Sequence, residues 1–302
     1  MKRLQAASLI TAIKTPYDAN GDICLTTYDA LIEQQIAAGV DGIIVGGTTG
    51  EGQLLSWEEH IILIAHCVHR FSDRLIIVGN TGSNNTREAI KATENGFAVG
   101  MDASLQINPY YGRTSFAGVA EHFQRVLAIG PAFIYNVPGR TGQDLTPEII
   151  EPLAKHKNFI GVKECAGNER IAYYEEQGIP CWSGNDDECF DGKHKFGSHG
   201  VISVTSNIVP GLMRQLMDNN VPEVNERLQS LMKWLFCEPN PIAINTALMM
   251  TGAVATNFRL PYKALTQVQR EEGAKLLREI DQKDLVGDTV SVLADNDFNY
   301  CA

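Results

Sequence analysis

The chain has 302 residues, of which 44% are hydrophobic and 20% are charged, and its formal net charge is −11. This length suffices for one large α/β domain with an appendage, and the composition is that of a folded globular protein. The negative charge argues against a nucleic-acid partner, because phosphate binding needs a basic face. No apolar run approaches the length of a membrane span, and the first residues lack the apolar core of a signal peptide. The seven cysteines form no CxxC pair, so we expect reduced thiols in a reducing compartment.

Short β-rich runs alternate eight times with amphipathic stretches in the first part of the chain. The expected strands are residues 8–15, 42–47, 75–80, 103–108, 132–137, 159–164, 181–185 and 200–205. Helical patterns lie between and after them, notably at residues 27–38, 57–71, 85–99, 116–129, 147–156 and 210–219. Regular alternation of this kind predicts parallel βαβ units with strands covered on both faces. Eight units favour a closed (β/α)8 barrel over an open sheet.

The pattern changes after residue 223. Residues 224–236, 241–251 and 266–280 predict helices with no strands between them. We therefore expect two domains, a barrel at 1–223 that carries the active site and a helical C-terminal domain at 224–302. Residues 295–302 are expected to form an ordered or fraying tail.

Lys163 ends the short apolar run that begins at Phe159. Burial lowers the pKa of a lysine, and the neutral amine can then attack a ketone and form a Schiff base. The alternative is a solvated lysine after a strand, which would be the better interpretation of a lone lysine. Lys14 also ends an expected strand and is a rival amine, ranked second because no proton-transfer residue neighbours it in the sequence. Cys165 has no histidine placed to activate it and is expected to be a buried small hydrophobe.

Polar groups also gather where two other expected strands end. The glycine-rich stretch around Thr48 and Thr49 can present backbone N–H groups and paired hydroxyls to a carboxylate, although it could be an ordinary βα turn. It contains neither GxxxxGK[ST] nor GxGxxG, so phosphate or dinucleotide binding is disfavoured. Tyr135, at the end of the fifth expected strand, could transfer protons, or it could simply pack inside the barrel. Arg140, in the loop that follows, could bind a carboxylate through two hydrogen bonds, or it could be a solvated cation on a loop.

Three other groups of residues are weaker candidates. Tyr110 and Tyr111 lie together on a loop, where paired tyrosines more often pack or form an interface than catalyse. His66 and His69 have helical spacing without an acidic partner pattern and are interpreted as helix surface rather than metal ligands. The acidic run Asp186-Asp187-Glu188 stands where a helix is expected to begin, so we interpret it as N-terminal capping.

Five segments resemble the dihydrodipicolinate synthase family, one of the pyruvate-dependent lyases and aldolases. They occur in the family's order across the whole barrel, which a chance match would not reproduce. Residues 52–57 and 182–188 resemble the plant-type branch in particular. The five segments are Gly47-Thr-Thr-Gly-Glu51, Asn108-Pro-Tyr-Tyr111, Tyr135-Asn-Val-Pro-Gly-Arg-Thr-Gly142, Gly161-Val-Lys-Glu164 and Gly200-Val-Ile-Ser-Val204.

The resemblance implies a lyase that condenses pyruvate with L-aspartate 4-semialdehyde in lysine biosynthesis through diaminopimelate. Lys163 would form the imine with pyruvate, and Tyr135 would move protons in a relay through Thr48 to Tyr111. The resemblance further implies that Tyr111 reaches in from an adjacent subunit. No metal and no organic cofactor would be needed. The implied substrate-binding residues are Thr49 for the pyruvate carboxylate, Arg140 for the semialdehyde carboxylate, and Gly184 and Ile202 near the imine.

The family's feedback site for lysine also maps onto the chain, at an interface between two subunits. Glu88 could pair with the α-amine of the effector, and Trp57 and His60 could pack against its aliphatic stem; helix-face packing is an equal alternative for those two rings. The resemblance implies a homo-oligomer, a dimer of dimers, and a plastid location with the transit peptide absent from this chain; a chain outside the plant type would be cytoplasmic. The implied lysine-site residues are Gln53, Trp57, His60, Asn84, Glu88 and Tyr110.

Two other functions compete with this interpretation. A pyruvate aldolase acting on a sugar acid would use the same imine chemistry, but such an enzyme more often has a neutral residue in place of Arg140. A non-catalytic barrel that senses a keto acid is disfavoured by the complete set of Lys163, Tyr135 and Thr48.

Overall fold

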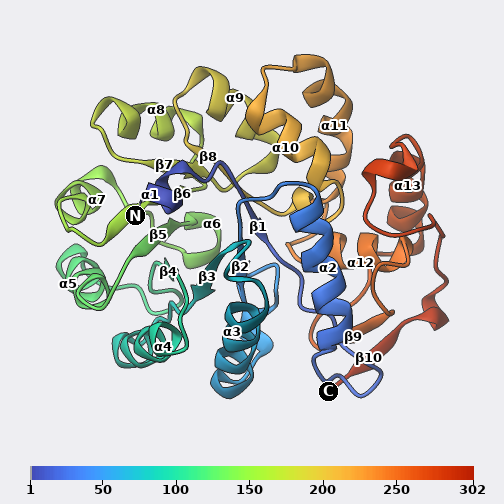
Figure 1. Ribbon diagram of the computed structural model, residues 1–302, viewed down its shortest axis with the longest axis horizontal. Helices are drawn as coiled ribbons and strands as arrows, with labels where there is room; N and C mark the ends of the chain where they lie inside the picture. Colours follow the sequence, from blue (N-terminus) through green and yellow to red (C-terminus); the bar gives the residue numbers. More distant parts are fainter. Residues whose placement is uncertain (1) are drawn as a thin grey trace.

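Eight parallel strands close into a barrel in the computed structural model, which describes residues 2–302 (Figure 1). The strands are β1 (Leu9–Ala12), β2 (Gly42–Val45), β3 (Ile76–Asn80), β4 (Ala103–Ile107), β5 (Ala132–Asn136), β6 (Phe159–Glu164), β7 (Cys181–Ser183) and β8 (Gly200–Ser203). Neighbours pair in chain order, and β1 closes the barrel on β8, where Leu9 lies opposite Val201. All eight predicted strands are present, and the predicted (β/α)8 barrel is confirmed.

Helices ring the barrel and cover the outer faces of its strands (Figure 1). The α-helices of this part are α1 (Lys2–Ala6), α2 (Leu25–Ala37), α3 (Trp57–Phe71), α4 (Thr86–Ala98), α5 (Phe116–Leu127), α6 (Pro138–Thr141), α7 (Pro147–Ala154), α8 (Asn168–Glu176), α9 (Cys189–Lys195) and α10 (Pro210–Asp218). Short 3-10 helices lie at η1 (Gly52–Leu54), η2 (Asp186–Glu188), η3 (Thr205–Asn207), η4 (Gln282–Asp284) and η5 (Asp295–Asp297).

Local signals in the sequence explain where several of these helices begin. Ser56 accepts a hydrogen bond from the backbone N–H of Glu59, and Glu59 accepts one from Ser56 in return, so a capping box starts α3. A serine cap also precedes α5, and Pro147 occupies the first position of α7.

Side chains that point into the barrel form a core of their own. Phe133 and Trp182 meet edge to face, with ring centroids 5.0 Å apart. The indole N–H of Trp182 donates to the carbonyl of Ala7 at 2.7 Å, and Leu4 of α1 packs into the same cluster. The N-terminal segment therefore closes the end of the barrel at which the strands begin, and polar groups gather at the other end.

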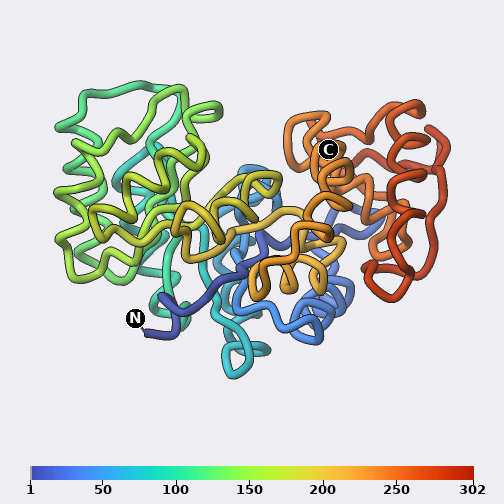
Figure 2. Tube along the Cα trace, turned by 90° about the horizontal axis from the view of Figure 1, so that it is seen from above, coloured from blue at the N-terminus to red at the C-terminus, as the bar shows by residue number. Residues whose placement is uncertain are grey.

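The C-terminal part adds three helices and a small sheet, and the tube view places it to one side of the barrel (Figure 2). The helices are α11 (Pro222–Trp234), α12 (Ile242–Met250) and α13 (Gln267–Arg278). Strand β9 (Asn257–Arg259) pairs in parallel with β10 (Asn299–Cys301), so the expectation that this part contains no strands is wrong. The final segment is ordered by this pairing. Strands of three residues are too short to show an alternation of apolar and polar residues, and the two paired strands lie far apart in the sequence, so neither strand could be predicted.

The predicted domain boundary falls within α11, which begins at Pro222. One hydrophobic cluster contains residues of both parts, for example Val204 and Leu212 from the barrel and Leu248 and Leu277 from α12 and α13. The division into two domains stays a prediction. None of the helices described between residues 2 and 302 combines the length and apolar character needed to span a membrane.

Candidate active site

The pairing of β5 with β6 places Tyr135 directly beside Lys163. The Lys163 amine lies 4.3 Å from the centroid of the Tyr135 ring. Both side chains are 6% exposed, so they stand at the inner wall of the barrel rather than in bulk solvent. The predicted nucleophile and the predicted proton-transfer group are therefore neighbours.

Burial sets the protonation of this pair. It lowers the pKa of the Lys163 amine; the Cys165 side chain and the Asp186 carboxylate oppose that shift, and the Arg140 guanidinium adds to it. Within residues 2–302, no carboxylate forms an ion pair with this amine. Burial also raises the pKa of the Tyr135 hydroxyl well above its usual range, and the nearby Thr48 side chain opposes part of the rise. Both shifts favour the uncharged forms of the amine and the phenol, and an uncharged amine is the form that nucleophilic attack requires.

A cavity of about 240 Å³ opens over the Lys163 amine. Its size suits a small organic acid rather than a cofactor. Six of the predicted residues line it, and they come from the ends of different strands: Thr48, Thr49, Tyr135, Arg140, Lys163 and Gly184. The C-terminal ends of the strands are where a (β/α)8 barrel carries its chemistry.

Gly184 is required by the close packing around the amine. A Cβ atom at this position would lie 2.3 Å from the Cys165 sulfur and 3.1 Å from Cε of Lys163. A larger residue would therefore clash with Cys165 and press against the Lys163 side chain. Cys165 itself borders the cavity, where burial raises its thiol pKa to about 11, so the thiol stays protonated near neutral pH.

Arg140 and Thr49 are held by one residue that the sequence did not nominate. Arg140 Nη2 donates to the carbonyl of Asn240 at 2.9 Å, and the Asn240 side-chain amide donates to Thr49 Oγ1 at 3.1 Å. Asn240 lines the cavity and is 6% exposed. It precedes α12 and belongs to no strand end, so no pattern in the sequence pointed to it.

Two predicted residues lie away from this cavity. Ile202 is fully buried and packs in the inner barrel core with Ile44 and Tyr135, beneath the cavity rather than in its wall. Tyr111 is 95% exposed and has a φ of +70°, so its own chain leaves the ring uncovered. For a tyrosine this left-handed backbone is unfavourable, and it aims the side chain outward.

A second cavity, of about 530 Å³, lies next to the first and shares Thr48 and Arg140 with it. Five of the six predicted lysine-site residues line this second cavity: Gln53, Trp57, His60, Glu88 and Tyr110. Asn84 does not line it, but its side-chain amide donates to the carbonyl of Tyr110 at 3.2 Å.

The aromatic wall of the second cavity is preformed. The rings of Trp57 and His60 stack with centroids 5.4 Å apart. Burial lowers the pKa of His60 to about 4, so the imidazole is neutral near neutral pH. Trp57, His60 and Glu88 line the same cavity, which therefore offers both a neutral aromatic surface and a carboxylate to a ligand.

The interpretation of Asp186 as a helix cap is wrong. This carboxylate is buried and accepts hydrogen bonds from the backbone N–H groups of Val204 and Thr205 at 2.9 and 2.8 Å, and from the Thr205 hydroxyl at 3.0 Å. It therefore ties the end of β7 to the end of β8. A run of three acidic residues did not reveal which one turns inward.

The rival amine, Lys14, has a different environment. It is fully buried and forms an ion pair with Glu51, whose carboxylate also accepts a 2.6 Å hydrogen bond from Asn245 of α12. Lys14 lines neither of the two cavities. A paired amine that lines neither of these cavities is a structural group.

Comparisons with known proteins agree with this geometry. A model of the dihydrodipicolinate synthetase family matches residues 5–280. The chloroplastic 4-hydroxy-tetrahydrodipicolinate synthase of Nicotiana tabacum is 56% identical over 297 residues, which cover 98% of this chain and 83% of the relative.

Solved structures are similar over nearly the same length. The chloride-inhibited dihydrodipicolinate synthase from Acinetobacter baumannii, complexed with pyruvate, has a TM-score of 0.86 at 32% identity and covers 91% of this chain and 98% of its own. The enzyme from Cyanidioschyzon merolae with lysine bound has a TM-score of 0.86 at 28% identity, with coverage of 91% and 98%. The chain belongs to the dihydrodipicolinate synthetase family and is an enzyme of the 4-hydroxy-tetrahydrodipicolinate synthase type.

Proposed function

We propose that this chain condenses pyruvate with L-aspartate 4-semialdehyde through a Schiff base on Lys163, giving 4-hydroxy-tetrahydrodipicolinate in the committed step of lysine biosynthesis. The observation that supports this most strongly is the Lys163 amine, which is buried, has no ionic partner in the part of the chain that the structure describes, and faces a small cavity beside Tyr135. The relative from Acinetobacter baumannii is described as a complex with pyruvate, the substrate that this proposal places on the amine.

The chemistry begins with attack of the neutral amine on the keto carbon of pyruvate. The resulting carbinolamine loses its hydroxyl as water, which needs one proton, and leaves an iminium ion. Removal of a proton from the methyl group then gives the enamine. Tyr135 lies beside Lys163, and in this proposal it serves both proton transfers. The Tyr135 hydroxyl forms a hydrogen bond with Thr48, and Thr48 also lines the second cavity.

The enamine carbon then adds to the aldehyde of the second substrate. The amine of that substrate attacks the former keto carbon, closes the ring and expels the Lys163 amine, so the enzyme is regenerated without a cofactor. Thr49 and Arg140 both line the cavity, and in this proposal Thr49 holds the pyruvate carboxylate and Arg140 holds the semialdehyde carboxylate. Asn240 bonds to both residues and therefore fixes the spacing of the two carboxylate sites.

The exposed ring of Tyr111 supports an active dimer. A tyrosine that its own chain leaves 95% exposed on a strained backbone gains most by packing against a second copy. In this proposal Tyr111 enters the partner subunit and completes the proton relay through Thr48 there, and two such dimers assemble into a tetramer.

The second cavity is the proposed feedback site for lysine. Glu88 can pair with the α-amine, while the stacked Trp57 and His60 rings can cover the aliphatic stem. The relative from Cyanidioschyzon merolae is described with lysine bound. Since the relative from Nicotiana tabacum is named as chloroplastic, we place this enzyme in the plastid as part of the same proposal.

The direct test is a coupled assay with both substrates, with and without lysine. We expect pyruvate consumption that depends on aspartate semialdehyde and that falls when lysine is added. The absence of pyruvate consumption in the presence of aspartate semialdehyde would defeat the proposal, and consumption with a sugar-acid aldehyde instead would favour the aldolase alternative.

A variant of the second cavity tests the feedback site. Trp57→Ala should weaken inhibition by lysine at least about tenfold, the effect expected when a buried aromatic contact is lost. The matched control is Tyr173→Ala, because Tyr173 has the same exposed fraction of 38% and lines neither cavity. If the Trp57→Ala enzyme were as sensitive to lysine as the parent, the assignment of the second cavity as the lysine site would be wrong.

A further inference from the structure

A second pair of buried polar side chains lies directly behind Tyr135 and Lys163. We propose that Asn136 and Glu164 are positioning residues, whose hydrogen bond holds β5 and β6 in the register that sets Tyr135 against Lys163. This inference rests on the proposed function, because it concerns how that active site is assembled.

Strand geometry connects the two pairs. Tyr135 lies opposite Lys163, and Asn136 lies opposite Glu164 at the next position. Since successive side chains in a strand point to opposite faces, the first pair points into the barrel and the second pair points toward the surrounding helices. Asn136 is 0% exposed and Glu164 is 1% exposed.

The contacts of the outer pair are well formed. The Asn136 amide donates to Oε1 of Glu164 at 2.8 Å, and the backbone N–H of Ala166 donates to the same oxygen at 2.8 Å. Oδ1 of Asn136 accepts a 3.0 Å bond from the N–H of Leu145. One asparagine thus joins β5, β6 and the loop that follows α6.

The register of these two strands needs such a bridge. The pairing shifts by one residue near the start of β5, where Ala132 lies opposite Phe159 but Phe133 lies opposite Gly161. A slip of one residue turns every side chain of a strand to its other face. At the catalytic end the backbone ladder closes with the bond from the N–H of Cys165 to the carbonyl of Asn136, at 3.1 Å. The side-chain bridge fixes the register at that same position.

The loop beyond the bridge is anchored as well. The Asn136 amide also donates to Asp144 at 2.7 Å, and Asp144 pairs with Arg170 of α8 at 2.9 Å. This loop follows α6, which carries Arg140. The outer network therefore supports three of the proposed catalytic and binding residues from the side that the substrates do not reach.

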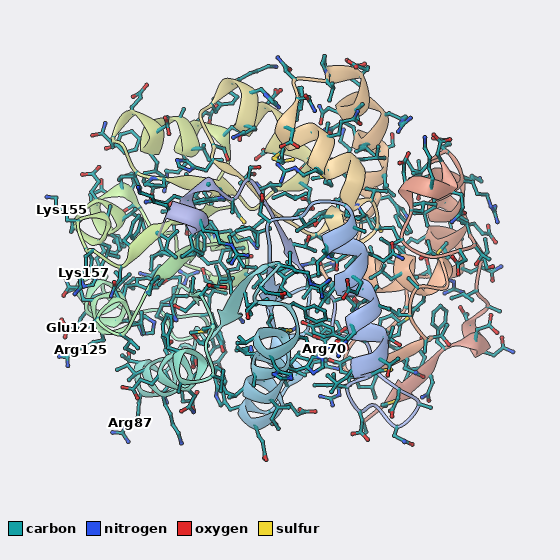
Figure 3. All side chains as sticks on the ribbon, in the orientation of Figure 1. Arg70, Arg87, Glu121, Arg125, Lys155 and Lys157 are labelled. Atoms are coloured by element: carbon teal, nitrogen blue, oxygen red, sulfur yellow. The ribbon has the colours of Figure 1, made fainter. Side chains whose placement is uncertain are left out.

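The chemistry of the bridge suggests a sharp pair of variants. Oε1 of Glu164 only accepts hydrogen bonds, and glutamine offers an acceptor oxygen of the same shape. Glu164→Gln should therefore keep the bridge, whereas Glu164→Leu removes it at similar volume. Glu121→Leu is the matched control: Glu121 lies on the outer surface of α5, where Figure 3 shows it beside Arg125 at the rim of the molecule, at a salt-bridge distance of 2.6 Å.

The readouts are kcat, KM for each substrate and thermal stability. We expect Glu164→Leu to lower kcat about 10–100-fold, because a displacement near 1 Å of a reacting group can cost that much. KM for aspartate semialdehyde should change less than about threefold, and Glu164→Gln and Glu121→Leu should stay within about threefold of the parent in kcat. A folded Glu164→Leu enzyme with parental kcat would overturn the inference, as would equal losses in Glu164→Gln and Glu164→Leu.

Asn136→Leu decides the matter if Glu164→Leu does not fold. It retains the approximate size of the side chain and has no group that can donate to Glu164, so a kcat loss like that expected for Glu164→Leu supports the inference, and a parental kcat overturns it. Failure of the parent enzyme to consume both substrates would instead refute the proposed function, so the two failures are distinguishable.

Discussion

Lys14 and Lys163 are both buried and both lie near the ends of barrel strands, yet their surroundings are opposite. Burial lowers the pKa of each amine. Lys14 forms an ion pair with Glu51, and its amine also lies 4.9 Å from the Tyr17 ring centroid. Lys163 forms no such ion pair with any residue that the structure describes, and it faces a cavity with its amine 4.3 Å from the Tyr135 ring centroid.

The difference shows what separates a structural amine from a nucleophilic one. Glu51 opposes the lowering of the Lys14 pKa and favours the charged form of that amine, in which no lone pair is available for chemistry. For the Lys163 amine, Cys165 and Asp186 oppose the effect of burial only through longer-range charge and no ion pair forms within the described chain, so burial favours the neutral form that the chemistry uses. Burial alone does not show which of the two lysines is the nucleophile, because both are buried. The presence of an ionic partner at Lys14 and the absence of one at Lys163, among the residues described, distinguish them.

Lys163→Met separates the two lysines most strongly. We expect turnover to fall by at least about 10³-fold, since no other amine among residues 2–302 lines the cavity to form the imine. Lys14→Met should retain turnover in the fraction that is folded. Coupled assays at equal concentrations of folded protein measure the turnover of both variants. An active Lys163→Met enzyme would show that Lys163 is not the nucleophile.

Tyr135→Phe should have the next largest effect. Loss of the hydroxyl that transfers protons should reduce kcat about 10²–10⁴-fold with little change in the folded structure. Tyr28→Phe is the control, because Tyr28 is fully buried on α2 and lines neither cavity. Equal activity of the two variants would show that the Tyr135 hydroxyl takes no part in the reaction.

Lys14→Met should lower stability where Lys163→Met does not. Breaking one side of a buried ion pair typically costs about 3–5 kcal/mol, because the remaining charge is left unpaired. The double variant Lys14→Met/Glu51→Gln should recover at least half of that loss, which urea denaturation of the parent, the two single variants and the double variant can measure. Losses that simply add would mean that the two side chains are not coupled.

The smallest expected effect is a pH dependence in the stability of Lys163→Met. The folded-state pKa of Lys163 is lowered, so between that pKa and 10.5 the unfolded chain binds more protons and the parent becomes more stable as pH rises. At pH 7 the variant should be more stable by roughly 1–3 kcal/mol, the cost of an unpaired buried polar group, and its advantage should shrink at pH 10. Lys14 is present in both the parent and the variant, so its contribution to the pH dependence of stability cancels in the difference between them. An advantage that is constant or that grows with pH would contradict the assigned direction.

Most of the barrel could be predicted because its information is local. Apolar runs such as Phe159 to Lys163 alternate with amphipathic stretches, and that alternation specifies parallel strands whose ends meet at one face. The neighbouring positions of Lys163, Thr48 and Tyr135 follow from this topology.

The parts that were missed depend on contacts between distant segments. Asn240 reaches Arg140 and Thr49 from the C-terminal part, and Asp186 turns inward to accept three hydrogen bonds. β9 and β10 are too short to show a pattern and exist because they pair. Propensity and periodicity describe one segment at a time, so they cannot reveal which polar residue will satisfy another segment.

Borohydride reduction in the presence of pyruvate, followed by peptide mass spectrometry, tests the comparison of the two lysines most directly. We expect a reduced pyruvate adduct on the peptide that contains Lys163, none on the peptide that contains Lys14, and none on either peptide when pyruvate is omitted. An adduct on Lys14, or an unmodified Lys163 in protein that turns over both substrates, would contradict this expectation.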